Sequence, residues 1–364
     1  MVVRFHNPIL SFIVCLLLFS VGASAQTVIS EYHPGATTDG AVYYLPRTAL
    51  RISVLVERTS YQPGDFASYA QRYLRLPSVS LQPSVSHRVV SITQTPFGMA
   101  DKKKGFAVKF NAKTVAANVA LADDGRLLAI NAEPIPETLP KAFEPAPKAA
   151  PLNPRQFLNE EILAAGSTAK MAELTSREIY DLRENRSLLI KGQADFMPKD
   201  GAQLQLMLSQ LETQENALRS LFEGTTTCDT TEYVITFTPE APVSRQTLFR
   251  LSQDLGIVDA DDLSGEPFYI TVDDLNTVPP VDEEAAAKTK KKVYEEGVYV
   301  NVPGRMRTTI FQGIDQLVQS EFPAPQFGNV ELLSAELFNK RYTTSLWLNP
   351  ISGAVDRLQA EMTK

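Results

Sequence analysis

The chain has 364 residues, 44% of them hydrophobic, and its 42 acidic side chains outnumber 35 basic ones, giving a net charge of −7. That length and apolar content are enough for cores in two or three domains. The acidic balance excludes a general affinity for nucleic acid, so we expect no nucleic acid as a partner. Cys15 lies in a segment that we expect to be removed, which leaves Cys228 without a partner for an intramolecular disulfide.

Residues 1–25 have the three parts of a secretory signal peptide. Arg4 gives a basic start, an apolar run follows over 9–21, and small residues occupy 22–25. We therefore expect cleavage between Ala25 and Gln26. The apolar run is shorter than the roughly 20 residues that span a bilayer, and no later segment is long and apolar enough. The expectation is a periplasmic or secreted protein with no membrane span after signal removal.

Residues 26–133 predict an N-terminal β domain with one short helix. Runs rich in branched and aromatic residues alternate with turn signals such as Pro63-Gly64. The apolar spacing over 66–74 predicts the helix. The expected strands are at 41–45, 50–56, 86–93, 106–110 and 127–132.

Residues 134–154 form a Pro-rich linker. Seven prolines in this segment remove backbone donors and favour extended polyproline geometry, so we expect a semi-rigid spacer. A proline-rich recognition ligand is the alternative interpretation.

Residues 155–224 predict an antiparallel helical hairpin. Apolar residues follow three-four spacing over 168–191 and again over 200–222. Gly192 can end the first helix, Pro198 prevents a continuous helix, and Asp200 can begin the second. Each helix would be about 35 Å long, enough to project from the β domains or to brace them.

Residues 225–364 predict a C-terminal β domain, with a charged loop at 279–296. The expected fold class is therefore α+β, with two β-sandwich-like domains flanking a central helical hairpin. The expected C-terminal strands are at 232–237, 246–251, 268–272, 298–302, 307–311, 342–348 and 354–360.

The β segments on the two sides of the hairpin share landmarks in the same order. Residues 40–46 (GAVYYLP) parallel 297–303 (GVYVNVP), Phe97-Gly98 parallels Phe327-Gly328, and residues 125–133 parallel 353–361. Duplicated units produce such repeats. Unrelated β hairpins also converge on a Gly turn followed by alternation, so both interpretations stay open.

No catalytic motif is present. After signal removal only His33 and His87 remain as histidines, with Cys228 as the one cysteine, and no zinc, phosphate-binding or nucleophile-elbow pattern occurs. We expect no catalytic residue and no cofactor.

Acidic residues gather at Asp259, Asp261 and Asp262, close to Glu266. Two acids at about 5 to 10 Å would serve glycoside hydrolysis, and alternate aspartates can aim oxygens at a calcium ion. A turn between two strands is the plainer interpretation, because Asp and Gly favour turn geometry. Calcium at Asp259, Asp261 and Asp262 is the one metal hypothesis that the sequence offers.

Trp347 is the single tryptophan of the chain. In a strand, Leu346 and Leu348 would share one face while Ser345 and Trp347 share the other. An exposed Trp347 would be a ligand-binding platform for a sugar ring, and core or edge packing is the alternative.

The stretches 164–174 (AAGSTAKMAEL), 178–180 (EIY) and 193–201 (QADFMPKDG) resemble a family of exported Bacteroidota proteins, domain of unknown function 4831. Residues 66–74 and 327–333 resemble other parts of it. The resemblance implies the envelope or exterior of a Gram-negative bacterium and brings no catalytic residues. Bacteroidota O-glycosylate a short motif that Asp229-Thr230-Thr231 fits, so Thr230 is a predicted glycosylation site.

We therefore expect a non-enzymatic periplasmic scaffold or binding protein, whose helical hairpin offers an apolar stripe to a protein partner. The alternative is a carbohydrate-binding or glycan-hydrolysing protein of the cell envelope, which would use Trp347 or the acids at 259–266.

Overall fold

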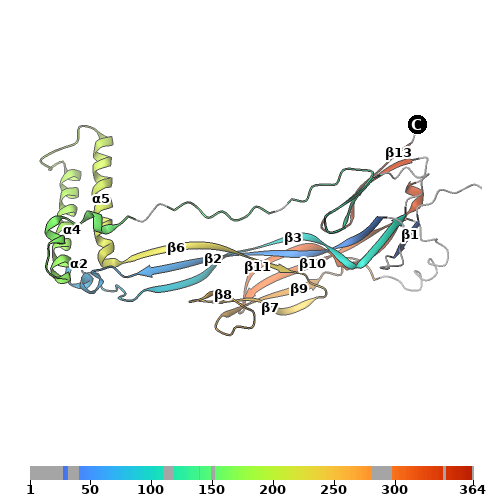
Figure 1. The fold of residues 1–364 in the computed structure, drawn as a ribbon, viewed down its shortest axis with the longest axis horizontal. Helices are drawn as coiled ribbons and strands as arrows, with labels where there is room; N and C mark the ends of the chain where they lie inside the picture. Colours follow the sequence, from blue (N-terminus) through green and yellow to red (C-terminus); the bar gives the residue numbers. More distant parts are fainter. Residues whose placement is uncertain are drawn as a thin grey trace, which may run out of the picture.

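A computed structural model describes residues 28–31, 41–109, 118–138, 140–148, 152–280, 297–338 and 342–362. The molecule is elongated, with the long helices at one end and the strands along the rest of its length (Figure 1). The expected signal peptide and residues 281–296 of the charged loop lie outside the described residues.

The first sheet has the strand order β1-β3-β2-β6 and is antiparallel. The central strands are long because alternating β-branched and aromatic residues continue through them, with one face buried. Its strands are β1 (Val28–Glu31), β2 (Ala41–Gln62), β3 (Ser84–Lys109) and β6 (Thr225–Phe237).

The second sheet has the order β11-β10-β9-β7-β8 and packs on the first. Leu50, Ile52 and Val54 of β2 meet Phe268 and Ile310 in a shared core, with all five side chains fully or almost fully buried. The strands are β7 (Val243–Ser252), β8 (Gly256–Val258), β9 (Glu266–Asp274), β10 (Gly297–Gln312) and β11 (Asp315–Ser334).

The third sheet has the order β13-β12-β5-β4 and lies at the end of the molecule away from the helices (Figure 1). Leu127, Ile130 and Leu346 of this sheet pack against Tyr43 and Val298. The elements here are β4 (Val119–Leu121), β5 (Leu127–Ile130), the 3-10 turn η3 (Ala335–Phe338), β12 (Tyr342–Leu348) and β13 (Val355–Met362).

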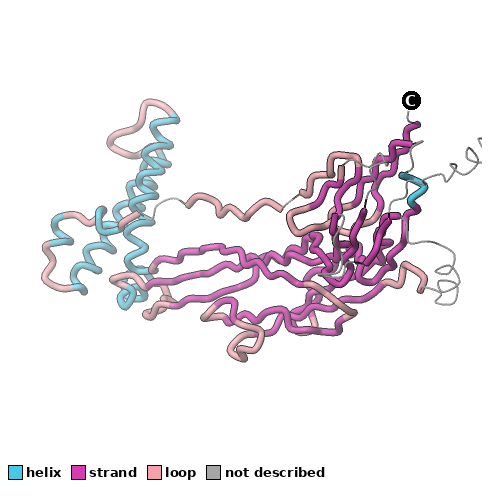
Figure 2. The backbone as a smooth tube through the Cα atoms, turned by 45° about the vertical axis from the view of Figure 1, so that its right-hand side comes forward, coloured by secondary structure: helices cyan, strands magenta, loops and turns pink. Residues whose placement is uncertain are grey.

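Figure 2 shows the helices other than η3 gathered at the opposite end, where β2, β3 and β6 also end. Ser167 and Asp200 cap the long helices α4 and α5 by accepting hydrogen bonds from Lys170 and Gln203, and Gly192 ends α4 in a left-handed conformation. The elements are η1 (Ala67–Tyr69), α2 (Ala70–Leu74), η2 (Pro154–Phe157), α3 (Glu160–Leu163), α4 (Thr168–Lys191) and α5 (Gly201–Glu223). The predicted hairpin and the predicted short helix are both present.

The Pro-rich linker runs along the molecule from the third sheet to the helices (Figure 1). It contacts the edge strand β6 on the way: the Phe143 N–H donates to the Glu232 carboxylate at 3.3 Å, and Lys148 binds Asp229 and the Cys228 carbonyl. The linker therefore has fixed contacts along one edge of the first sheet.

The fold class is α+β and mostly β, as the sequence predicts. Strands from the two sides of the hairpin share sheets, since β6 pairs with β2 and β12 pairs with β5. The hairpin is central in the sequence but terminal in space. The predicted domain boundaries at residues 133 and 225 therefore divide the chain into segments, but the sheets are continuous across these boundaries.

The two longest β hairpins contain the same irregularity. In β2, Leu45 lies at a register shift, and residues 101–104 of β3 have no pairing partner in β2 there. In β10, Pro303 lies at a register shift, and residues 325–328 of β11 have no pairing partner in β10 there. The two irregularities are equal in size and lie one residue apart when 40–46 is aligned with 297–303, which favours duplication. The Phe-Gly landmarks do not correspond, because Phe97 pairs with Ala49 while Phe327 lies within the unpaired residues.

Candidate functional site: a groove at the tip of the helical hairpin

The base of the hairpin is a closed apolar core. Ile179 of α4 packs with Leu218 and Phe222 of α5, and Phe66 from the β2–β3 connection completes the contact. The Phe66 and Phe222 rings are tilted, with centroids 5.4 Å apart. The core fixes the lower half of both helices to the β2–β3 connection.

A buried carboxylate lies above this core. Glu215 of α5 is 5% exposed, and its oxygens lie 2.6 Å from Arg183 Nε and 3.2 Å from Arg186 Nη1. Two guanidinium groups compensate the desolvation of one carboxylate. The two ion pairs hold α4 and α5 together where the base core ends.

Beyond Glu215 the two helices enclose an open groove of about 580 Å³. Its walls come from the last turns of α4 and the first half of α5, and the α4–α5 loop closes its end. The lining is mostly apolar, with side-chain amides at its rim: Asn185, Leu188, Leu189, Gln193, Ala194, Asp195, Phe196, Leu206, Met207, Gln210, Leu211 and Gln214.

Two of the apolar side chains that line the groove are open to solvent, whereas Leu189 is buried at its floor and the others are half-buried. Phe196 is 64% exposed and Leu206 61%. Among the described residues that line the groove, Asp195 alone carries charge. Amides can exchange hydrogen bonds with a partner without charge, so the groove suits an apolar polypeptide surface better than a charged small molecule.

The acidic residues at 259–262 form the turn between β8 and β9. The Asp262 carboxylate accepts the Ser264 N–H at 2.9 Å, which lowers its pKa, and the Asp262 N–H donates to the Asp259 carbonyl. Across the described ranges, no three His, Cys, Asp or Glu side chains come together in a way that would hold a metal ion. Calcium at Asp259, Asp261 and Asp262 stays a prediction, while turn formation accounts for Asp262.

Trp347 lies on the face of β12 that the sequence predicts. Leu346 and Leu348 are buried, whereas Trp347 is half-buried on the other face. Its indole N–H donates to the Glu133 carbonyl at 3.0 Å, and the Arg357 guanidinium lies over its ring, 5.3 Å from the centroid. The acidic turn belongs to a different sheet, so the structure does not bring Trp347 and those acids together.

Thr230 lies half-buried in the edge strand β6, opposite Glu57 of β2. The neighbouring Asp229 is held by Lys148 of the linker, and that hydrogen bond keeps the pKa of Asp229 below its ordinary value. Cys228 is exposed and free. The predicted cleavage residues Ala25 and Gln26, and His33, lie outside the described residues.

The model of the family described as Domain of unknown function (DUF4831) matches residues 39–356. The chain belongs to this family. No curated protein and no solved structure matches the chain. The matched residues of this DUF4831 protein include the whole hairpin and its groove. None of its described helices is long and apolar enough to cross a membrane.

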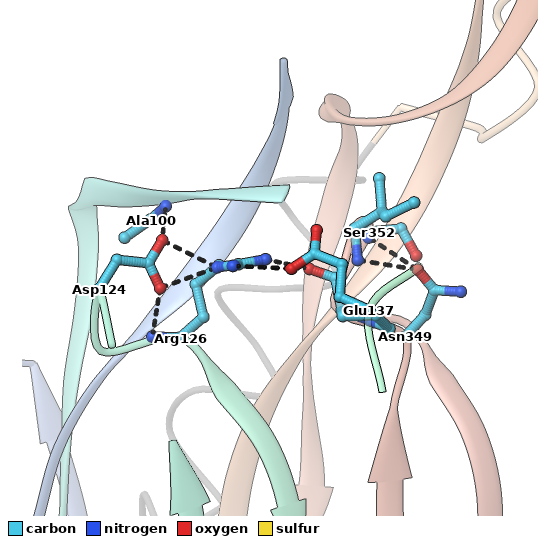
Figure 3. Close-up of polar contacts among 8 residues, drawn as sticks. Ala100, Asp124, Arg126, Glu137, Asn349 and Ser352 are labelled. Atoms are coloured by element: carbon cyan, nitrogen blue, oxygen red, sulfur yellow. Dashed lines mark hydrogen bonds and ion pairs between the residues drawn. The ribbon is translucent and has the colours of Figure 1, made fainter. Parts of the chain in front are cut away.

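Sequence reasoning missed a polar cluster at the β end of this DUF4831 protein, around Arg126, whose side chain is 9% exposed (Figure 3). Its Nε lies 2.8 Å from both carboxylate oxygens of Asp124, Nη1 donates to the Pro350 carbonyl at 2.5 Å, and Nη2 reaches Glu137 at 3.2 Å. Asp124 also accepts the Ala100 N–H. The cluster joins β3, the β4–β5 turn, the linker and the β12–β13 turn.

The electrostatics of this cluster are those of a structural contact. Burial by itself raises the pKa of Asp124, but the hydrogen bond and charge of Arg126 outweigh burial, and the pKa lies below its ordinary value. The one signal in the sequence is the Asp124-Gly125-Arg126 turn before an apolar strand. That signal does not reveal Pro350, which is remote in the chain.

Proposed function

We propose that this DUF4831 protein is a non-enzymatic scaffold or binding protein, in which the groove at the hairpin tip holds an amphipathic helix of a protein partner. The observation that carries the proposal is the groove itself: apolar, open, almost uncharged, and built on helices that are fixed at their base. It offers no pair of titratable groups for acid–base chemistry, and its form suits recognition.

A helix is the occupant because the walls of the groove are themselves helical ridges. Met207, Leu211 and Gln214 follow i, i+4, i+7 spacing along α5, and Leu188 continues the opposite wall on α4. A third helix can place its own ridge between them, which turns the open hairpin into a three-helix bundle. The small charge of the lining predicts a partner helix with an uncharged apolar face.

Site-specific photo-crosslinking in the living cell tests the proposal. A photoreactive amino acid at Met207, inside the groove, should give a discrete adduct with one envelope protein, and mass spectrometry of the adduct should locate the link in an amphipathic helix. The control position is Ile190, which is 67% exposed on α4 but is not among the lining residues. Equal adducts at both positions, or none at Met207, would remove the support for a groove partner.

We also propose that the protein is exported and works in the periplasm or outside the cell of a member of the Bacteroidota. The support is the signal-peptide pattern of residues 1–25 and the resemblance given above. Mass spectrometry of the mature protein should show an N-terminus at Gln26 and a glycan on Thr230. A full-length chain in the cytoplasm would contradict export, and an unmodified Thr230 would contradict glycosylation.

A carbohydrate-directed role is the second proposal, and its support is the position of Trp347 on the outward face of β12. Trp347→Ala should abolish glycan binding without unfolding the third sheet, because the side chain lies on the face opposite Leu346 and Leu348. Glycan-array binding of the two proteins, compared at equal folded concentration, measures this. Absence of binding by the wild-type protein would end the proposal.

A further inference from the structure

The edge strand β13 of the third sheet is amphipathic and open on both faces. All eight of its residues are exposed. Leu358, Ala360 and Met362 share the face of the buried Leu346, while Arg357, Gln359 and Glu361 share the opposite face. Leu358 is 40% exposed and Met362 78%, so the apolar face of the strand is largely uncovered.

The other edges of the three sheets carry features that discourage pairing with another chain. β1, β4 and β8 are only three or four residues long. β11 contains Pro323 and Pro325, and the linker covers part of β6 through Lys148. Short strands, prolines and covering segments are the usual protections of sheet edges. Within its described residues, β13 has no proline, no lysine and no covering segment.

We propose that β13 pairs with β13 of a second copy of this chain, antiparallel and centred on Gln359. The argument is charge complementarity. In this register Arg357 lies opposite Glu361 of the second copy, and by symmetry Glu361 lies opposite the second Arg357, so two opposite-charge pairs form on one face. Leu358 and Ala360 of the two copies meet on the other face, and an isologous pair of this kind forms a closed dimer.

The present contacts of these side chains are compatible with the pairing. Arg357 stacks over the Trp347 ring, which leaves the edge of its guanidinium free to donate. Glu361 accepts one hydrogen bond, from Gln359, and a carboxylate can accept several. The dimer would join two four-stranded sheets into one, and the hairpins would lie away from the junction because they occupy the opposite end of each molecule (Figure 1).

Charge reversal tests the pairing, with the oligomeric state measured by sedimentation velocity over a range of concentrations of the mature full chain. Arg357→Glu or Glu361→Arg alone places like charges opposite each other twice, and each should raise the dissociation constant by about tenfold. The double variant R357E/E361R restores both pairs and should restore the dimer. Because both residues are exposed, thermal melting of all three variants should be unchanged at a concentration at which every form is monomeric.

Disulfide trapping tests the register, in a Cys228→Ser background. Gln359→Cys places the two thiols opposite each other and should give a covalent dimer on mild oxidation. Glu361→Cys is the control, since its thiol would lie four residues, or about 13 Å, along the strand from its counterpart and should not cross-link.

A protein that is monomeric at every concentration overturns the proposal. A β13 strand that pairs with a strand of a different protein, and not with a second β13, overturns it as well. So does a dimer that the double variant fails to restore, or one that cross-links through Glu361→Cys and not through Gln359→Cys. Leu206→Asp at the hairpin groove should leave the dimer unchanged.

Discussion

The β end and the hairpin end of this molecule are packed in opposite ways, and their glycines show it. A Cβ atom on Gly98 would lie 2.1 Å from the Pro350 carbonyl oxygen, and one on Gly328 would lie 2.0 Å from the Val302 carbonyl oxygen. A Cβ atom on Gly166 or Gly201, beside or within the hairpin, would have no atom within 4 Å. At the base of the hairpin the packing is again close, since a Cβ atom on Gly64 would lie 2.2 Å from the Leu221 carbonyl oxygen. The unfilled space at the hairpin end therefore lies outside its base core.

The comparison teaches where the molecule is fixed and where it is adaptable. At the β end, Arg126 uses its donors on Asp124, Glu137 and the Pro350 carbonyl, so its buried guanidinium group is paired. At the hairpin tip, apolar side chains such as Leu206 have no cover. A tightly packed end suits a scaffold, and an uncovered apolar end suits a binding surface.

The largest effect on stability is expected from a Gly→Ala substitution, compared between the β end and the hairpin. Gly98→Ala should lower the free energy of unfolding by about 3 kcal/mol, because the new Cβ atom meets the backbone of the β12–β13 turn and also Arg126. Gly201→Ala, at the first residue of α5, should leave stability unchanged or raise it by up to about 1 kcal/mol. Chemical denaturation measures both, and equal effects would mean that the two ends are packed alike.

A smaller effect is expected from pH. The pKa of Asp124 is lowered in the folded protein, so the stabilisation by its carboxylate is fully present above its ordinary pKa of 3.8. That contribution is lost as the pH falls from there through the lowered value. Asp124→Asn should remove this part of the acid sensitivity, while Asp261→Asn in the exposed β8–β9 turn should not. Urea titrations between neutral pH and pH 3 compare the three proteins.

The smallest effect is expected at the hairpin tip. Leu206→Asp should change the free energy of unfolding by less than about 0.5 kcal/mol, because the side chain is 61% exposed. Thermal denaturation of the purified chain is sufficient. A loss of several kcal/mol would show that Leu206 is part of a core in solution and that the groove is closed.

The sequence predicted the elements better than their connections. Three-four spacing and the signals at Gly192 and Asp200 placed both long helices correctly. The pairings of β2 with β6 and of β5 with β12 join residues far apart in the chain, and no local pattern specifies them. The same limit hid the Arg126 cluster, which depends on the carbonyl of Pro350.

The errors in the strands lie at prolines. Segments 41–45 and 50–56 are one strand, β2, and 298–302 and 307–311 are one strand, β10. Pro46 directly follows the register shift at Leu45, Pro303 lies at a register shift, and both strands continue past them. β11 was not predicted, because Pro323 and Pro325 made its sequence resemble a loop.

The central claim is that the groove at the hairpin tip binds a partner helix, and the most direct measurement is the affinity of the purified partner for three forms of the full chain. For Leu206→Asp, which places a charge in the groove, we expect a dissociation constant at least tenfold above the wild-type value, equivalent to about 1.4 kcal/mol. For Ile190→Asp, a substitution of an equally exposed residue outside the groove, we expect no change. Equal affinities for all three forms, or a loss of binding with Ile190→Asp alone, would contradict the claim.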